Sequence, residues 1–355
     1  MKRWLFPALI LLSACATEDQ SKNAMAKHDA GVKFVYGSFS EAQQMATAEE
    51  KMIIMDVYAD WCVPCKKLDK AVFKDAAVGD FVNARFVGLK IDGEKGEGPD
   101  IMKKYGIPGY PTVILMDTEG NEIDRIVGFG EKEAYVETLK DYVSGKGTLA
   151  DYLARLAEKP DDWELHLALA EKYDDRQDLL TAAKHYQAVL DNAPAEEQEV
   201  RESSSFQLAI CDLARENPQP LTTFLETSDN QGFIKRGAGS LARYYLKRDK
   251  PGEAFQAYET VLKRVPPDAG FLNAYAWRIF QSKQDSHYAR GIELAEKAVA
   301  LEPESDAIWD TLAQLRYANG DVKGAIEAMS KAASINPEES GYQKLLAEYQ
   351  GKAAA

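Results

Sequence analysis

The 355-residue sequence has few of the residues that build metal sites. It contains four cysteines and four histidines, and the histidines are scattered at positions 28, 166, 185 and 287. Two of the cysteines share one short motif, so the cysteines and histidines do not have the spacing of a zinc site. We therefore expect no metal.

The sequence also lacks an excess of basic residues. Its 57 acidic residues outnumber its 43 basic residues, without long blocks of one sign, for a net charge of -14. A nucleic-acid backbone would be repelled by this charge, so nucleic acid is not an expected partner. With 45% hydrophobic and 28% charged residues, the chain has the composition of globular protein, and its length allows two domains.

The first residues have the charged, apolar and small-residue regions of a secretory signal. Their apolar stretch is too short to cross a bilayer, which takes about 20 residues. The Leu-Ser-Ala-Cys run at 12–15 resembles the lipobox of bacterial lipoproteins, which implies removal of residues 1–14 as a signal peptide and lipidation of Cys15. The resemblance also implies a protein that is anchored to a membrane of the bacterial cell envelope and faces the periplasm. An ordinary signal peptide with a chance cysteine is the alternative.

Residues 15–30 are polar and have no apolar period, which predicts a flexible tether. Residues 31–147 then alternate between apolar runs and helix-like segments, which predicts an α/β domain with a mixed sheet and helices on both faces. The expected strands are 52–58, 86–91, 112–116 and 123–127, and the expected helices are 63–75, 98–105 and 131–143. Gly120 and Asn121 favour a tight antiparallel connection between the last two strands. The glycine-containing run at 144–147 marks the domain boundary.

From residue 150 to residue 350 the strand pattern vanishes and small residues recur with a period near 34. Three alanines precede a proline by 12 positions: Ala182 with Pro194, Ala254 with Pro266, and Ala325 with Pro337. This spacing resembles the tetratricopeptide repeat, in which small residues let paired helices pack closely and a proline ends the second helix. A generic helical domain with a chance period is the alternative.

The repeat resemblance implies an all-α solenoid with a concave surface that binds a protein partner. Its units are expected to begin near residues 163, 235, 269 and 306. The gap after the first unit leaves room for a divergent unit at 197–234, and residues 342–349 are expected to form a terminal capping helix.

Cys62 and Cys65 lie three positions apart, where an apolar strand meets a helix. At the start of that helix the dipole favours a thiolate, which predicts that Cys62 is the nucleophile. Cys65 follows on the same helical face and can close a disulfide with Cys62. Pro64 suits the first helical turn, where its missing N–H costs nothing. A structural disulfide or half of a metal site is the alternative.

The Trp61-to-Cys65 motif resembles the thioredoxin superfamily, and residues 57–68 with Phe73 are most similar to the C-terminal domain of DsbD-type reductases. The run from 106 to 112 resembles the family's loop with a cis-proline, which implies a cis peptide bond before Pro111. The resemblance further implies that the backbone of Tyr110 pairs with an extended substrate, and that Gly128 lets the substrate approach closely. Trp61 and Pro64 are expected to shape the surface that meets the substrate.

Asp56 lies six residues before Cys62 and matches the buried acid that accepts the proton of the second thiol in thioredoxins. Burial would raise its pKa and suit it to that exchange, whereas a position facing solvent at a strand end is the alternative. Thioredoxins usually carry a lysine near this acid. Alignment on Ile91 and Asp92 places Gly88 there instead, which leaves the tuning of the acid open.

Other cysteine and lysine side chains have simpler interpretations. Cys211 lies on an apolar helix face and is expected to be a buried, inert thiol. Lys66, Lys67 and Lys70 are expected to form a solvated helix face, from which Lys66 could add to the stabilisation of the thiolate.

These resemblances imply a thiol:disulfide oxidoreductase that needs no cofactor beyond the redox-active disulfide of Cys62 and Cys65. The residues between the cysteines include no histidine, which favours a reductase, because an imidazolium there would stabilise the thiolate and raise the potential. The expected partners are protein disulfide substrates, a thiol electron donor such as a DsbD-type membrane reductase, and a protein bound by the repeats. The alternatives are an oxidase or isomerase of the same fold, and a repeat scaffold whose thioredoxin fold is redox-silent.

Overall fold

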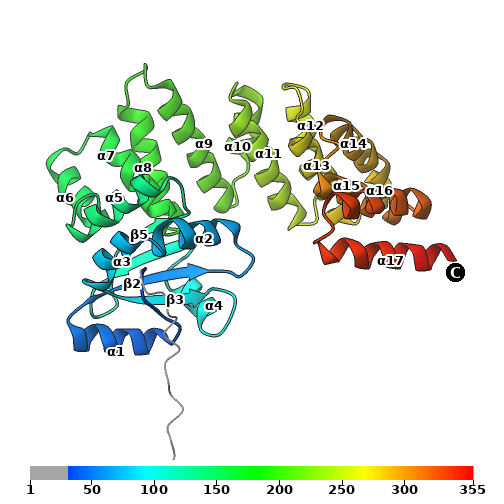
Figure 1. Cartoon of the computed structure of the whole chain (residues 1–355). Coiled ribbons are helices and arrows are strands. Elements are labelled where there is room, and N and C mark those ends of the chain that lie inside the picture. The colour runs from blue at the N-terminus through cyan, green and yellow to red at the C-terminus, as the bar shows by residue number, and fades with distance from the viewer. Residues whose placement is uncertain (1–30, 355) are drawn as a thin grey trace, which may run out of the picture. The chain divides into compact units, whose positions relative to one another are not determined.

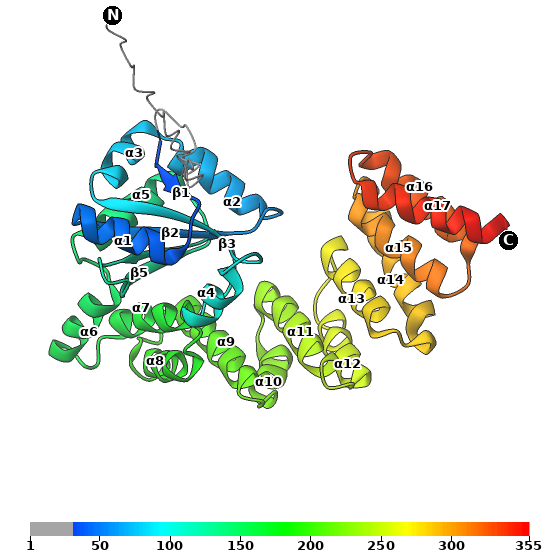
Figure 2. The same ribbon diagram turned by 90° about the horizontal axis from the view of Figure 1, so that it is seen from below.

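The computed structural model describes residues 31–354, which divide into two compact units. The first unit runs to Tyr152 and takes in Asp175–Gln177, and the second holds the remaining residues from Leu153. Figures 1 and 2 show a sheet with flanking helices in the first and paired helices in the second. The expected signal peptide and tether lie outside the described residues. None of the helices described has the length and apolar character to cross a bilayer.

A five-stranded mixed sheet forms the centre of the first unit, with strand order β1-β3-β2-β4-β5. Its strands are β1 (Phe34–Val35), β2 (Met52–Tyr58), β3 (Phe86–Asp92), β4 (Thr112–Met116) and β5 (Glu122–Val127). β3 runs parallel to β1 and β2, whereas β4 is antiparallel to both β2 and β5. The four expected strands are all present, and the two-residue β1 is an additional strand that was not expected.

Helices cover both faces of this sheet, as the apolar pattern predicted. They are α1 (Phe39–Glu49), α2 (Val63–Leu68), a π-helical segment η1 (Asp69–Phe73), α3 (Ala76–Asn83), α4 (Gly98–Lys104) and α5 (Lys132–Val143). Successive residues of β2 point to opposite faces, so Ile53 packs in the core with α1 and α4, and Ile54 in the core with α3 and α5. The helix expected over 63–75 is therefore α2 continued by η1, and α1 and α3 were missed.

The second unit is all-helical, and its helices pack in successive pairs (Figures 1 and 2). They are α6 (Leu149–Glu158), which begins at the end of the first unit, α7 (Trp163–Asp174), α8 (Leu179–Asn192), α9 (Gln198–Ala214), α10 (Gln219–Thr227), α11 (Gln231–Leu246), α12 (Pro251–Leu262), α13 (Ala269–Ser282), α14 (Tyr288–Leu301), α15 (Asp306–Ala318), α16 (Val322–Ile335) and α17 (Ser340–Ala354), with a short 3-10 turn η2 (Asp285–His287). The predicted solenoid is confirmed. Ala182, Ala254 and Ala325 are fully buried, which is why small residues recur at these positions.

The unit starts expected from the sequence agree closely with the helix starts. α7, α13 and α15 begin at residues 163, 269 and 306, and α11 begins at Gln231, slightly before the expected 235. The divergent unit consists of α9 and α10, and the expected capping segment lies within α17.

Candidate active site

Cys62 and Cys65 form a disulfide just after the end of β2, where α2 begins. Both side chains are nearly buried, with exposed fractions of 2% and 7%. Cys62 is the N-cap of α2, and its Sγ accepts the backbone N–H of Cys65 at 3.1 Å. A thiolate at this position would be stabilised by that N–H and by the helix dipole. Pro64 lies in the first turn of α2, where the helix needs no N–H from it.

Tyr110 packs beside the cysteines and is joined to Pro111 by a cis peptide bond, the geometry that the resemblance implied. The ring of Trp61 packs edge to face on Tyr110, with 6.0 Å between the ring centroids. Its indole N–H donates to a carboxylate oxygen of Glu94 at 3.0 Å. Trp61 and Val63 are nonetheless largely exposed, at 65% and 59%, so an open apolar surface borders the disulfide.

Gly128 follows the end of β5 and its N–H donates to the carbonyl of Pro111 at 2.7 Å. Its φ of +78° lies in the left-handed region, where a side chain is disfavoured. A Cβ there would meet no atom within 4 Å. The glycine is therefore required by its backbone conformation, and the space beside it is open to an approaching chain.

Asp56 is buried in β2, with an exposed fraction of 2%, so the position facing solvent is excluded. Burial raises its pKa to about 6, and the nearby ammonium of Lys90 only partly opposes that shift. Its Oδ1 has no hydrogen-bond partner among the described residues. A buried carboxylate with a free oxygen and a pKa near neutrality can accept and return a proton.

Lys90 is a lysine close to Asp56, in the role for which the sequence offered only Gly88. It pairs with Asp56 in the parallel register of β2 and β3, and its Nζ lies 3.3 Å from Oδ2 of Asp56. Gly88, the position expected to lie near the acid, instead pairs with Ile54. The alignment was wrong by two residues, because strand register is fixed by the paired backbones rather than by a count from Ile91. A Cβ at Gly88 would lie 2.6 Å from a carbonyl oxygen of Lys33, so the glycine belongs to the packing of β1.

Cys211 and three of the histidines, His166, His185 and His287, lie in the second unit. Cys211 has an exposed fraction of 1%, and burial raises the pKa of its thiol to about 12, which confirms the prediction of a buried thiol. His166 and His185, scattered in the sequence, lie on α7 and α8 with their Nδ1 atoms 2.8 Å apart. Among residues 31–354, the side chains do not gather into a group of three or more that could hold a metal.

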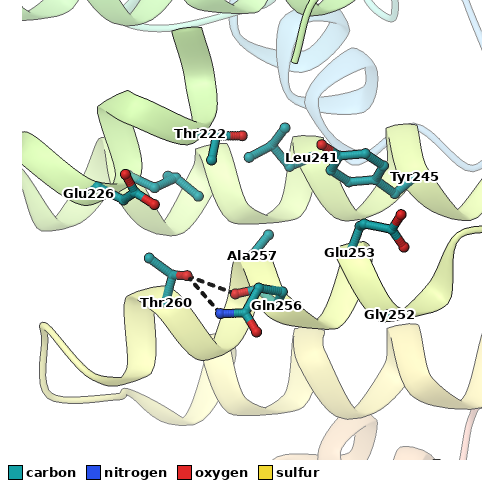
Figure 3. Close-up of a pocket in the computed structure, with 10 residues that line it drawn as sticks. Thr222, Glu226, Leu241, Tyr245, Gly252, Glu253, Gln256, Ala257 and Thr260 are labelled. Atoms are coloured by element: carbon teal, nitrogen blue, oxygen red, sulfur yellow. Dashed lines mark hydrogen bonds between the residues drawn. The ribbon is translucent and has the colours of Figure 1, made fainter. Parts of the chain in front are cut away.

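A cavity of about 350 Å³ lies between α10, α11 and α12 of the second unit. Its lining is Thr222, Leu225, Glu226, Leu241, Tyr245, Gly252, Glu253, Gln256, Ala257 and Thr260. Figure 3 shows the two glutamates at opposite ends of the pocket and Thr260 hydrogen-bonded to Gln256. No sequence signal marks this cavity, because α10 belongs to the divergent unit that lacks the repeat signature.

A family profile described as a thioredoxin-like domain matches residues 39–143, the range that holds the cysteine pair, Asp56 and Pro111. This part of the chain belongs to the thioredoxin-like family. A profile described as a tetratricopeptide repeat matches residues 282–349. The chain is thus a thioredoxin-like domain followed by tetratricopeptide repeats.

Relatives of the thioredoxin-like domain include the thiol:disulfide interchange protein DsbD of Yersinia pestis (strain Pestoides F), 28% identical over 144 residues, which are 39% of this chain and 24% of that protein. DsbD of Actinobacillus pleuropneumoniae is 35% identical over 107 residues, 29% of this chain and 18% of that protein. The chain thus spans a quarter or less of these relatives. A solved structure of a candidate disulphide-isomerase from Bacteroides thetaiotaomicron is 41% identical, with 32% of this chain and 94% of that chain covered and a TM-score of 0.31.

Proposed function

We propose that this chain is a thiol:disulfide oxidoreductase that reduces disulfides of proteins. The observation that carries the proposal is the pair of nearly buried cysteines at the start of α2, beside the loop that holds Pro111. In the thioredoxin-like family this is the arrangement for thiol:disulfide exchange, and it needs no cofactor beyond the Cys62–Cys65 disulfide.

The exchange runs in two substitutions at sulfur. The thiolate of Cys62 attacks one sulfur of the substrate disulfide, whose S–S bond breaks as a mixed disulfide forms and the first substrate thiolate leaves. Cys65 loses its proton to Asp56 and attacks the sulfur of Cys62, which releases the second substrate thiolate and closes the Cys62–Cys65 disulfide. The substrate gains two electrons and its two sulfurs take up two protons. A thiol electron donor, for which a DsbD-type membrane reductase is our candidate, restores the dithiol by the reverse steps.

The direction of electron flow is tested by the reduction potential. We expect a value near the thioredoxin end of the range, around -270 mV, because Val63 and Pro64 add no positive charge beside Cys62. The full chain would be equilibrated in glutathione buffers and its oxidised fraction measured. A potential above about -170 mV would favour the oxidase or isomerase instead.

The repeats are proposed to bind a protein partner independently of the redox state of the cysteines. The solenoid supports this proposal, because stacked helix pairs present extended binding surfaces. The cavity between α10, α11 and α12 supports it as well, because its lining contains no cysteine. We expect a partner purified with the wild type to bind a Cys62→Ser/Cys65→Ser variant with an unchanged Kd, measured by calorimetry. Binding that disappears in the double variant would make the repeats a spacer. A matched Glu226→Gln/Glu253→Gln variant reports whether the cavity takes part.

The proposed location is the periplasmic side of the cell envelope, through a lipid on Cys15. This rests on the sequence pattern before Cys15, which lies outside the described residues. Labelled fatty acid is expected to enter the wild type and a Cys211→Ser control, and not a Cys15→Ala variant. Equal labelling of all three proteins would contradict the anchor.

A further inference from the structure

A second surface borders the disulfide, on the side of Cys65 rather than of Trp61. It is a cavity of about 410 Å³, lined by Tyr36, Tyr58, Ala59, Asp60, Cys65, Lys66, Asp69, Lys70, Lys74 and Lys90. We call it the basic pocket, since four of its ten lining residues are lysines. Three of them, Lys66, Lys70 and Lys74, are exposed side chains along α2 and η1, and Lys90 reaches it from the sheet.

The positive charge of the basic pocket is only partly neutralised. The Nζ atom of Lys90 forms ion pairs with Asp56 and with Oδ1 of Asp69, the latter at 2.7 Å. The Nζ atom of Lys74 lies 3.6 Å from Oδ2 of Asp69, which is a longer contact. Asp60 is engaged by Lys95, which lies outside the lining. Among the side chains of residues 31–354, no carboxylate forms an ion pair with Lys66 or Lys70.

Two like charges four residues apart on one face of a helical segment repel each other, as Lys66 and Lys70 do. Over residues 31–147 acidic side chains outnumber basic ones, so this concentration of lysines stands against the charge of its domain. The sequence alone suggested a solvated face for Lys66, Lys67 and Lys70. The structure separates them, because Lys67 does not line the cavity.

We propose that the basic pocket binds acidic side chains of a polypeptide substrate, next to the cysteine that Cys65 releases. This proposal rests on the proposed function, because the pocket borders Cys65, the cysteine that resolves the mixed disulfide. The exposed ammonium groups meet carboxylates as charge-assisted partners. The exposed ring of Tyr36 forms part of the pocket wall, and Tyr58 offers its hydroxyl as a hydrogen-bond donor. Burial raises the pKa of Tyr58, and the negative charges of Asp92 and Asp60 raise it further. The hydroxyl therefore stays protonated and can donate a hydrogen bond.

The test separates binding from catalysis. Fluorescent, cysteine-free peptides with three glutamates, three glutamines or three lysines are titrated with the oxidised full chain, and anisotropy is followed at low salt. We expect the glutamate peptide to bind about tenfold more tightly than the glutamine peptide, and about 0.5 M salt to remove most of that difference. The Lys66→Gln/Lys70→Gln variant is expected to lose the preference, and the matched Lys67→Gln variant to keep it.

A charge exchange guards against a variant that simply misfolds. Lys66→Glu/Lys70→Glu is expected to reverse the preference in favour of the lysine peptide, which a misfolded chain would not do. Equal binding of the three peptides to the wild type, or a preference that survives in both double variants, overturns the proposal. Displacement of the glutamate peptide by glutathione disulfide at equal concentration would also overturn it, in favour of a small anionic disulfide. Because these readouts need no reaction, they hold even if the chain reduces no disulfide, which would refute the proposed function alone.

Discussion

Replacing Cys62 by serine is expected to lower the rate of disulfide reduction by at least about a thousandfold, because a serine hydroxyl at neutral pH is not an ionised nucleophile as a thiolate is. The helix start and the N–H of Cys65 stabilise a negative sulfur at this position, and neither can ionise a hydroxyl whose pKa is far higher. The rate is measured as release of thiols from a peptide disulfide, with the full chain kept reduced by a chemical donor.

The matched control is Cys211→Ser, which is expected to reduce the same peptide at the wild-type rate. The thiol of Cys211 is buried in the second unit and its pKa is raised to about 12, so it supplies no thiolate at neutral pH. A Cys62→Ser variant with more than a tenth of the wild-type rate would contradict the assigned nucleophile. It would then favour the scaffold alternative, in which the cysteine pair serves only structure.

Replacing Asp56 by asparagine is expected to stabilise the oxidised thioredoxin-like domain by about 3 kcal/mol above pH 7 and by little below pH 4. The pKa of Asp56 is about 6 in the folded protein against an ordinary value of 3.8. Below pH 3.8 the carboxyl is protonated in both states and costs no stability. As pH rises from 3.8 to 6 only the unfolded state ionises freely, so the folded state loses stability, and above 6 the loss is complete.

The measurement is amide hydrogen exchange of β2 and β4 as a function of pH, since these strands report the opening of the first unit alone. An Asp80→Asn variant, at an exposed position of α3, is the control and is expected to change stability by less than about 0.5 kcal/mol. A stabilisation by Asp56→Asn that is equal at pH 4 and pH 8 would show that the side chain's ionisation is not its cause.

The strands and the repeat helices could be predicted because their signals are local. β2 and β4 are nearly uninterrupted apolar runs, and the buried alanines of the repeats recur at a fixed period. α1 also had a local signal that was overlooked, since Ser38 and Glu41 form a capping box at its start. β1 had none, because a two-residue strand is too short for an alternating pattern.

The environment of the site depends on contacts between distant segments, which the sequence does not order. Lys90 could not be assigned to Asp56 without the register of β2 and β3, and an error of two residues put a glycine in its place. The basic pocket joins Tyr36 to lysines that follow it by about thirty residues or more. His166 and His185 likewise meet only because α7 and α8 pack together. The spacing of Cys62 and Cys65 in the sequence was enough to predict their pairing. Their neighbours in space depend on how strands and helices pack, which the sequence does not show.

The two surfaces that border the disulfide differ in chemical character, and this difference makes the site asymmetric. Trp61 and Val63 present apolar groups beside Cys62, and the lysines of the basic pocket lie beside Cys65. A disulfide in a client has two sulfurs that are chemically alike, so a symmetric site would attack either one. At this site the sequences that flank the two cysteines of the client would decide which sulfur is attacked first and which cysteine departs first. The site therefore provides a basis for regioselective thiol:disulfide exchange.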